Sequence, residues 1–424
     1  MLTRAERMQM TLMGSALACM ALSVFFGFLG ALYYLPIVSK LWINFDLSLV
    51  QLRPLHTTFA SAWLFLGALA GAHKFLHDEY GAPSDADALR FRGSMVLWGL
   101  AGLGALVSLP LGITTGREYL GFHPLVSLLI VAGWLLFLWT YLSRVRVGFF
   151  RHPVHVHMWT AGALYFLWTF AEGHAYLLDW VWERPLADLQ IQWKACGSLV
   201  ASFNLMIYGG LTYVGVRLSG DKSIGHSSTA FSLFGVSLLN SLTNYSHHTY
   251  HLPQSHSIKW IAFVVSMLEI ILLLRLLQEI SKAFLARKKP EWEKVNITER
   301  FCGLAKNWNV FLLILALGIS YPPWNGLIHG THVVMAHGMG SELAIDTYIL
   351  FGIFAWILAQ IFVKRETLVD VVHNEKIQRT RHGLNLALIG LVATLVISGT
   401  ATGIHRALGS PMPKWLDLTP AGIV

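Results

Sequence analysis

Long apolar runs dominate this chain of 424 residues and limit what it can fold into. A helix needs about 20 mostly apolar residues to cross the hydrocarbon core of a bilayer, and at this hydropathy only helices satisfy their own backbone in lipid. Eleven runs of this kind lie at roughly 10–37, 54–76, 92–115, 123–143, 154–178, 194–216, 227–249, 258–284, 308–329, 333–363 and 383–405. The sequence therefore predicts an all-α, polytopic membrane helix bundle of about 11–12 transmembrane helices, built as one integral membrane domain over 1–424.

The charges between these runs predict the orientation. Only 13% of the residues are charged, about half of the roughly 25% typical of a soluble domain. With the N-terminus inside, the inner segments hold 23 of the 31 lysines and arginines and the outer segments hold eight. This bias matches the positive-inside rule and places the N-terminus in the cytoplasm. Contact with the inner leaflet of a lipid bilayer accounts for the net charge of +8, so no nucleic-acid partner is expected.

Histidines gather at one depth of the predicted bundle. The chain has 19 of them, and an imidazole in an apolar layer is costly unless it is hydrogen-bonded or bound to metal. Several fall where the predicted helices meet the outer face, although they are far apart in sequence. These are His56, His247, His248, His329, His332 and His337. Because neutral imidazole is the commonest protein ligand for iron, copper and zinc, this convergence predicts a cofactor site.

The run His337-Gly338-Met339 indicates haem. Two positions along a helix are about 200° apart, so His337 and Met339 face opposite sides and can ligate two haems. Methionine is an axial haem ligand that raises the potential relative to a second histidine, although Met339 can equally serve in packing. The adjacent pair His247-His248 ends a helix and can hold a metal over one of the haems.

These residues resemble the catalytic subunit of bacterial nitric oxide reductase, within the haem–copper oxidase superfamily. Arg53-Pro54-Leu55-His56-Thr57 resembles the second-helix motif of the superfamily. His329-Gly330-Thr331 through Ala336-His337-Gly338 resembles the tenth-helix motif, and His247-His248 resembles the pair that binds the non-haem metal. Ser266-Met267-Leu268-Glu269 resembles the reductase segment that carries a glutamate, 22 positions after His247.

The resemblance implies a fold like subunit I of those oxidases and two haems, expected to be b-type. The sequence has no CxxCH, which excludes a covalently attached c-type haem. It implies a low-spin haem held by His56 and Met339 and a high-spin haem held by His337. A non-haem iron or copper is implied at His247 and His248, which with Glu269 form the implied catalytic set. The electron donor would be a c-type cytochrome subunit or a quinol, within a multi-subunit complex of the bacterial inner membrane, with the haems toward the periplasm.

The sequence departs from the reductase pattern at the low-spin haem and at the non-haem metal site, so the metal site is divergent. Met339 stands where the family has its second low-spin ligand, a histidine. An ungapped count back from His247 places Cys196 at the position of the third metal-binding histidine, and Val200 at that of a glutamate. Cys196 can complete a metal site or be a small buried hydrophobe. In the oxidases nearest to the reductases, a redox tyrosine precedes the pair, and here Ser241 takes that place, which disfavours oxygen reduction. Tyr245, two residues before the pair and on another helix face, is the alternative substitute.

Other polar residues remain candidates. Arg53 and Arg406 lie at the outer rim, where they can bind haem propionates or be loose rim charges. Glu269 lies roughly 16 Å into its predicted helix, so it is either a proton carrier or a hydrogen-bonded structural acid. Glu342 and Asp346 share a helix face at i,i+4 spacing, but the sequence assigns them no role.

Two functions therefore compete. The first is reduction of nitric oxide to nitrous oxide at a high-spin haem and non-haem metal, fed by the low-spin haem. The second is a catalytically degenerate membrane b-type cytochrome that relays electrons within a respiratory complex. The segment around Cys196 favours the second, and the retained pair His247-His248 favours the first. A transporter is a weaker alternative, because the paired broken helices typical of transporters are absent from the sequence.

Overall fold

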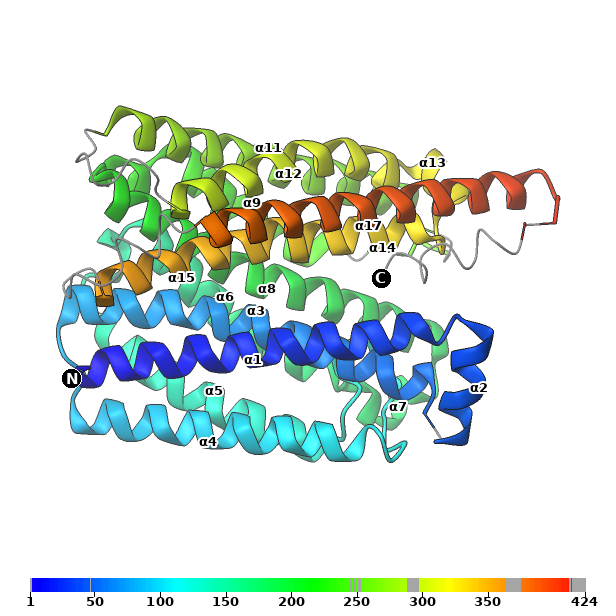
Figure 1. Cartoon of the computed structure of the whole chain (residues 1–424), viewed down its shortest axis with the longest axis horizontal. Helices are drawn as coiled ribbons and strands as arrows, with labels where there is room; N and C mark the ends of the chain where they lie inside the picture. Colours follow the sequence, from blue (N-terminus) through cyan, green and yellow to red (C-terminus); the bar gives the residue numbers. More distant parts are fainter. Residues whose placement is uncertain are drawn as a thin grey trace. The chain divides into compact units, whose positions relative to one another are not determined.

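The computed structural model describes residues 2–45, 47–243, 246, 249–250, 253–287, 297–362, 375–411 and 413. The described residues form long helices joined by short connections, without a strand among them (Figure 1). They divide into two compact units, residues 1–209 and 210–424, with the boundary inside helix α8 (Pro185–Ser219). The all-α prediction is confirmed, and the single haem-binding domain over 1–424 stays a prediction.

The first unit is a set of antiparallel helices. It contains α1 (Arg4–Leu32), α3 (Leu49–Tyr80), α4 (Asp85–Ser108), α5 (Pro124–Val145), α6 (Val154–Gly173) and the start of α8. A capping box in which Thr3 and Glu6 exchange bonds starts α1. Helix α1 packs along α3, and α4 packs along α5 (Figure 1).

A buried ion cluster joins α4 to α5 in the first unit. Asp87 is 4% exposed, and it accepts hydrogen bonds from Arg90 at 2.7 Å and from Arg144. A buried carboxylate is costly unless it is paired and hydrogen-bonded, so the two guanidinium groups allow Asp87 to stay ionised there. Asp87 thus shows that a buried carboxylate in this fold keeps its charge when arginines pair with it.

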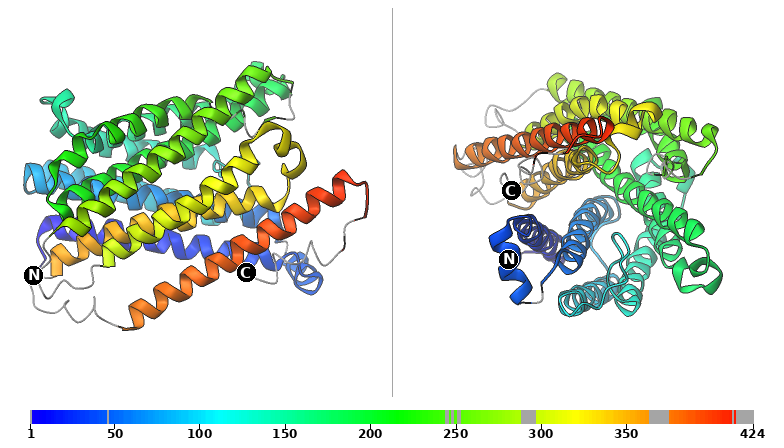
Figure 2. Two further views of the ribbon diagram at one scale, coloured as in Figure 1. Left: turned by 90° about the horizontal axis from the view of Figure 1, so that it is seen from above. Right: turned by 90° about the vertical axis from the view of Figure 1, so that its right-hand side faces the viewer.

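The second unit holds the tail of α8 and the remaining helices. These are α9 (Ser228–Thr243), α11 (His256–Ala286), α12 (Ile297–Ser320), α13 (Pro322–Ile328), α14 (His332–Met339), η5 (Gly340–Asp346), α15 (Thr347–Phe362) and α17 (Glu375–Ala407). Helix α17, orange to red in Figure 2, lies along α14, while α12 packs on η5 and α15.

Helices α14, η5 and α15 are continuous over residues 332–362, but the middle part is π-helical. The N–H of Thr347 donates to the carbonyl of Glu342, which is the i→i+5 pattern of a π-helix. The sequence predicted one regular helix over 333–363, and the structure differs from this prediction in the π-helical turns of η5. Such turns are rare, and they frequently mark functional sites.

Nine helices among the described residues are long and apolar enough to cross a membrane. Each overlaps one of the eleven predicted runs, although the predicted run 308–329 is divided at Tyr321 between the end of α12 and α13, where Pro322 and Pro323 begin the new helix. The other two runs correspond to α6 and α9, which have 20 and 16 residues. Many of the large side chains on these helices are exposed and apolar, such as Trp139 at 67% and Ile314 at 68%, which suits contact with lipid tails. The chain is an integral membrane protein.

Candidate haem-binding site

His56 lies on α3 and is held against α1. Its Nδ1 is 2.8 Å from the carbonyl oxygen of Ser23 and 3.2 Å from the Ser23 hydroxyl. A carbonyl oxygen only accepts hydrogen bonds, so Nδ1 carries the proton and Nε2 keeps its lone pair. A backbone carbonyl that fixes the ring through Nδ1 is the usual support of a metal-ligating histidine. His56 therefore fits its predicted role as an axial haem ligand.

A glycine on α1 makes room for this ring. A Cβ atom at Gly27 would lie 2.7 Å from His56 Nδ1, closer than real Cβ contacts. Gly27 therefore allows α1 to approach α3 closely enough for Ser23 to reach the histidine. The sequence analysis missed both residues, because they lie more than 25 positions upstream of His56 within an apolar run.

His337 lies on α14 with an unsatisfied ring nitrogen. Its Nδ1 is buried and has no hydrogen-bond partner among the described residues. Buried polar atoms are nearly always bonded, so an orphaned imidazole nitrogen indicates a missing partner. By contrast, Nδ1 of His332, one turn earlier, lies 3.2 Å from the Ser398 hydroxyl on α17. The His337 ring therefore lacks, among the described residues, a bond at Nδ1 like the one that supports His56, and its haem ligation through Nε2 stays a prediction. Met339, half-buried two positions on, lies on another face of the helix.

The predicted propionate ligands have protein partners. Arg53, whose side chain is 68% exposed, pairs with Glu118 at 2.6 Å. Arg406 is exposed and donates to the carbonyl of His329 at 3.2 Å. Exposed pairs of this kind contribute little, about 0–1 kcal/mol, so both side chains can exchange partners at small cost. Their propionate contacts stay predictions.

The predicted non-haem metal site is only partly described. His247 and His248 lie outside the described residues. Cys196 is buried on α8, and its thiol donates to the carbonyl of Glu118 at 3.7 Å. In the part of the chain that the structure describes, no group of three His, Cys, Asp or Glu side chains is placed to hold a metal ion. The thiol is therefore engaged as a small buried group, and its role as a ligand stays a prediction.

Glu269 on α11 is the centre of a buried hydrogen-bond network. Its side chain accepts from the Ser237 hydroxyl at 2.6 Å and from the Asn240 amide, both on α9. Ser266 donates to the Asn240 side-chain oxygen at 3.0 Å and closes the network. The sequence singled out Glu269 but missed its partners, because polar residues, mostly serines and threonines, recur along α9 and nothing in the sequence marks Ser237 and Asn240 among them.

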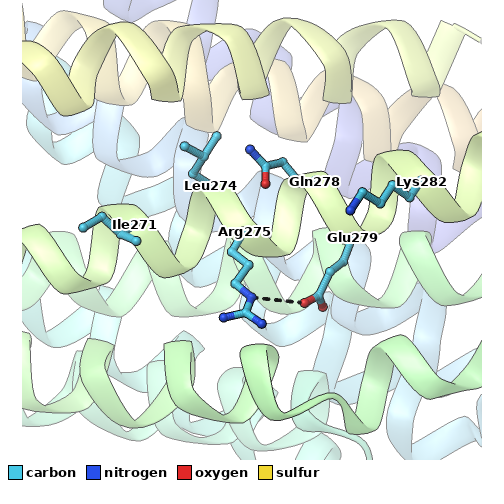
Figure 3. Close-up of a pocket in the computed structure, with 6 residues that line it drawn as sticks. All are labelled: Ile271, Leu274, Arg275, Gln278, Glu279 and Lys282. Carbon is cyan, nitrogen blue, oxygen red and sulfur yellow. Dashed lines mark ion pairs between the residues drawn. The ribbon is translucent and has the colours of Figure 1, made fainter.

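Two concave features lie apart from the predicted ligands. Figure 3 shows a hollow of about 390 Å³ along α11, where Arg275 pairs with Glu279 at 3.7 Å. The Thr229 hydroxyl also donates to Glu279, at 2.6 Å. In the first unit, an apolar cavity of about 130 Å³ is lined mainly by aromatic and aliphatic side chains, Phe59, Phe65 and Trp134 among them. Apolar cavities of this size stay dry and bind small neutral molecules.

Comparison with known proteins identifies the family. The family model for cytochrome c and quinol oxidase polypeptide I matches residues 7–421. The chain therefore belongs to the cytochrome c and quinol oxidase polypeptide I family, and it is a membrane respiratory haem protein of the haem–copper oxidase superfamily. Members of this family generally bind haems and a copper or other metal. No curated protein matches the sequence.

A solved structure supports the fold. It is described as a cryo-EM structure of a heme-copper terminal oxidase dimer that provides insights into its catalytic mechanism. The similarity covers 100% of this chain and 81% of that chain, with a TM-score of 0.68 and 12% sequence identity. At this identity the match establishes that the fold is that of subunit I of the haem–copper oxidases.

Proposed function

We propose that the chain is the catalytic subunit of a nitric oxide reductase-like enzyme. The reaction is 2 NO + 2 e⁻ + 2 H⁺ → N₂O + H₂O. His337 would hold the high-spin haem, and His56 with Met339 would hold the low-spin haem, both b-type. His247 and His248, assisted by Cys196, would hold a non-haem iron or copper. The haems and this metal would bind the substrate and supply the electrons, and the whole of 1–424 would act as one haem-binding domain.

The protein residues have defined tasks in this proposal. The Ser23 carbonyl fixes the His56 ring so that Nε2 presents its lone pair. Haem binding at His337 is supported by its place on an apolar helix, where the described residues give its buried Nδ1 no partner and no protein bond there holds the ring away from a haem. The Glu269 network between α9 and α11 holds a carboxyl group near the helix that ends before His247 and His248. We infer that this carboxyl shapes the metal site or carries protons to it.

Ser241 is the observation that favours nitric oxide over oxygen as the substrate. It takes the place of the redox tyrosine of the related oxidases, and its buried hydroxyl donates to the Leu238 carbonyl of its own helix at 2.6 Å. A serine cannot supply the electron and proton that a phenol gives when the O–O bond is cleaved. The apolar cavity in the first unit further suits a small neutral molecule that enters from the bilayer.

The electron donor, the membrane and the propionate contacts are further parts of this proposal. The sequence has no CxxCH, so a separate c-type cytochrome subunit or a quinol would supply the electrons within a multi-subunit complex. The membrane would be the bacterial inner membrane, with the N-terminus in the cytoplasm and the haems toward the periplasm. Arg53 and Arg406 would bind haem propionates by exchanging their present partners.

The second candidate is a membrane b-type cytochrome that relays electrons without reducing nitric oxide. The observation that favours it is Cys196, which stands where the family has a metal-binding histidine and donates to the Glu118 carbonyl. Both candidates keep the two haems, so the non-haem metal distinguishes them.

Metal and haem content of one detergent-purified sample tests the two candidates. The proposal predicts two haems and one further iron or copper per chain, together with consumption of nitric oxide and release of nitrous oxide. Double substitution of His247 and His248 by Ala should remove the extra metal and the turnover but leave both haems. Two haems without a further metal, and without turnover, would establish the relay cytochrome instead.

Replacement of Met339 by His should lower the midpoint potential of the low-spin haem, because methionine stabilises reduced haem iron relative to a second imidazole. A spectroscopic redox titration measures this shift. Met335, which is exposed on the same helix, provides the matched control, and Met335→His should leave the potential unchanged. An unchanged potential in Met339→His would show that Met339 only packs.

A further inference from the structure

Asp346 is a fully buried acid whose carboxyl group has no hydrogen-bond partner in the part of the chain that the structure describes. Its side chain is 0% exposed, and neither Oδ1 nor Oδ2 is bonded to any described residue. It ends the π-helix η5, nine positions after His337 on the same continuous helix. The neighbouring Thr347 hydroxyl donates to the Glu342 carbonyl at 2.8 Å and so does not serve Asp346. An ionisable group left in this state inside a membrane domain indicates function.

The charges near Asp346 differ in sign from those near Asp87. Both aspartates are buried, but Asp87 has two arginines as partners. Among the described residues, the charged groups that act on Asp346 are the carboxyls of Glu342 and Glu269, and neither can balance a negative charge. Transfer of an unpaired carboxylate into such a site costs so much that the group takes up a proton instead. The geometry of the site therefore requires the neutral acid.

The packing around η5 offers no better partner. Helix α12 lies against η5, and a Cβ atom at Gly340 would come within 2.6 Å of Leu312. On the same helix α12, the side-chain oxygen of Asn309 is also buried without a hydrogen-bond partner among the described residues. The Asn309 side-chain oxygen is a neutral acceptor, so it cannot balance a negative charge on Asp346. It is, however, the kind of group that a protonated acid or a transient water can bond.

We propose that Asp346 is held as a neutral carboxylic acid and is an internal proton store for the reaction at the His337 end of its helix. The destination of the proton rests on the proposed function. When water forms, the Asp346 O–H bond breaks and its proton is one of the two that the oxygen released from nitric oxide takes up. The second proton comes from the aqueous phase, and both electrons come from the cytochrome or quinol donor. The carboxylate left between two acids is unstable and regains a proton from the aqueous phase, so the acid is unchanged over the cycle.

Infrared spectroscopy of the purified haem-loaded protein tests the neutral acid without any turnover. A protonated carboxyl has a C=O stretch that ionised carboxylates lack and that shifts in D₂O. Asp346→Asn should remove one such band, with haem content and thermal midpoint unchanged, because an amide is close in shape to the neutral acid. Asp188→Asn is the matched control, because Asp188 pairs with Arg117 at 2.8 Å and should contribute no band.

If Asp346→Asn does not fold, Asp346→Glu replaces it and should move the band to a new frequency. A spectrum that neither variant changes would show that Asp346 is ionised and would overturn the proposal.

A single turnover of the fully reduced protein with nitric oxide tests the proton store. Asp346→Asn should slow proton uptake on the order of 10²-fold, the scale of a lost general acid, and Asp346→Glu should restore most of it. Normal proton uptake in Asp346→Asn would overturn the storage role. If the unmodified protein does not consume nitric oxide, the proposed function fails, and the infrared result still decides whether Asp346 is a neutral acid.

Discussion

His337→Ala should abolish carbon monoxide binding by the reduced protein and remove about one of two haems per chain. An alanine offers no lone pair, and the helix around position 337 is otherwise apolar, so the iron would lose its protein ligand. The loss should be complete rather than partial, because the described residues give this ring no other bonding role at Nδ1. A carbon monoxide difference spectrum and a haem assay on the same sample measure both effects.

Two further variants make this result specific. His332 lies on the same helix, and its ring contacts Ser398, so His332→Ala should keep the carbon monoxide spectrum. His337→Gly should regain the spectrum when imidazole is added, because the free base can enter the space left by the side chain. If the carbon monoxide spectrum survives in His337→Ala, another residue ligates the high-spin haem.

The fold follows closely from the apolar runs, because each run must cross lipid as a helix. What the sequence did not predict is the break in regularity after Met339. Hydropathy does not distinguish an α-helical from a π-helical segment, since both satisfy the backbone hydrogen bonds internally. The π-helix η5 lies in a packed environment, where Gly340 lets Leu312 of α12 approach. Such contacts depend on residues from different runs and cannot be read from one of them.

The sequence predicted candidate ligands, which stay predictions, but it did not predict the residues that contact them. His56 and His337 stood out because an imidazole in an apolar layer needs a partner. Ser23, Gly27 and Asn240 are unremarkable in sequence, and their roles arise only when α1 meets α3 or α9 meets α11.

The state of Asp346 could likewise be predicted only in part from the sequence. Its spacing from Glu342 was visible in the sequence, but its complete burial without a hydrogen-bond partner became visible only in the structure.

His56→Ala should remove the low-spin haem and leave the high-spin haem in place. The expected result is a haem content about one lower per chain, loss of the low-spin absorption band and retention of carbon monoxide binding. Electron entry from the natural donor should fail, whereas direct chemical reduction of the high-spin haem should succeed. His174→Gln, at the end of α6, is the control and should keep both haems, because both ring nitrogens of His174 are hydrogen-bonded within the protein. Retention of the low-spin band in His56→Ala would show that another residue ligates this haem.

Gly27→Ala should produce a smaller and distinct effect, since it adds one methyl group rather than removing the ligand. The new Cβ would lie 2.7 Å from His56 Nδ1, so the ring must turn and weaken its hydrogen bond to the Ser23 carbonyl. A weaker bond lowers the basicity of the imidazole as a ligand, so the low-spin haem should remain with a shifted midpoint potential. Gly14→Ala, on the same helix, where an added Cβ meets nothing within 4 Å, should leave the potential unchanged. An identical potential in Gly27→Ala and the unmodified protein would mean that the contact between α1 and His56 does not tune this haem.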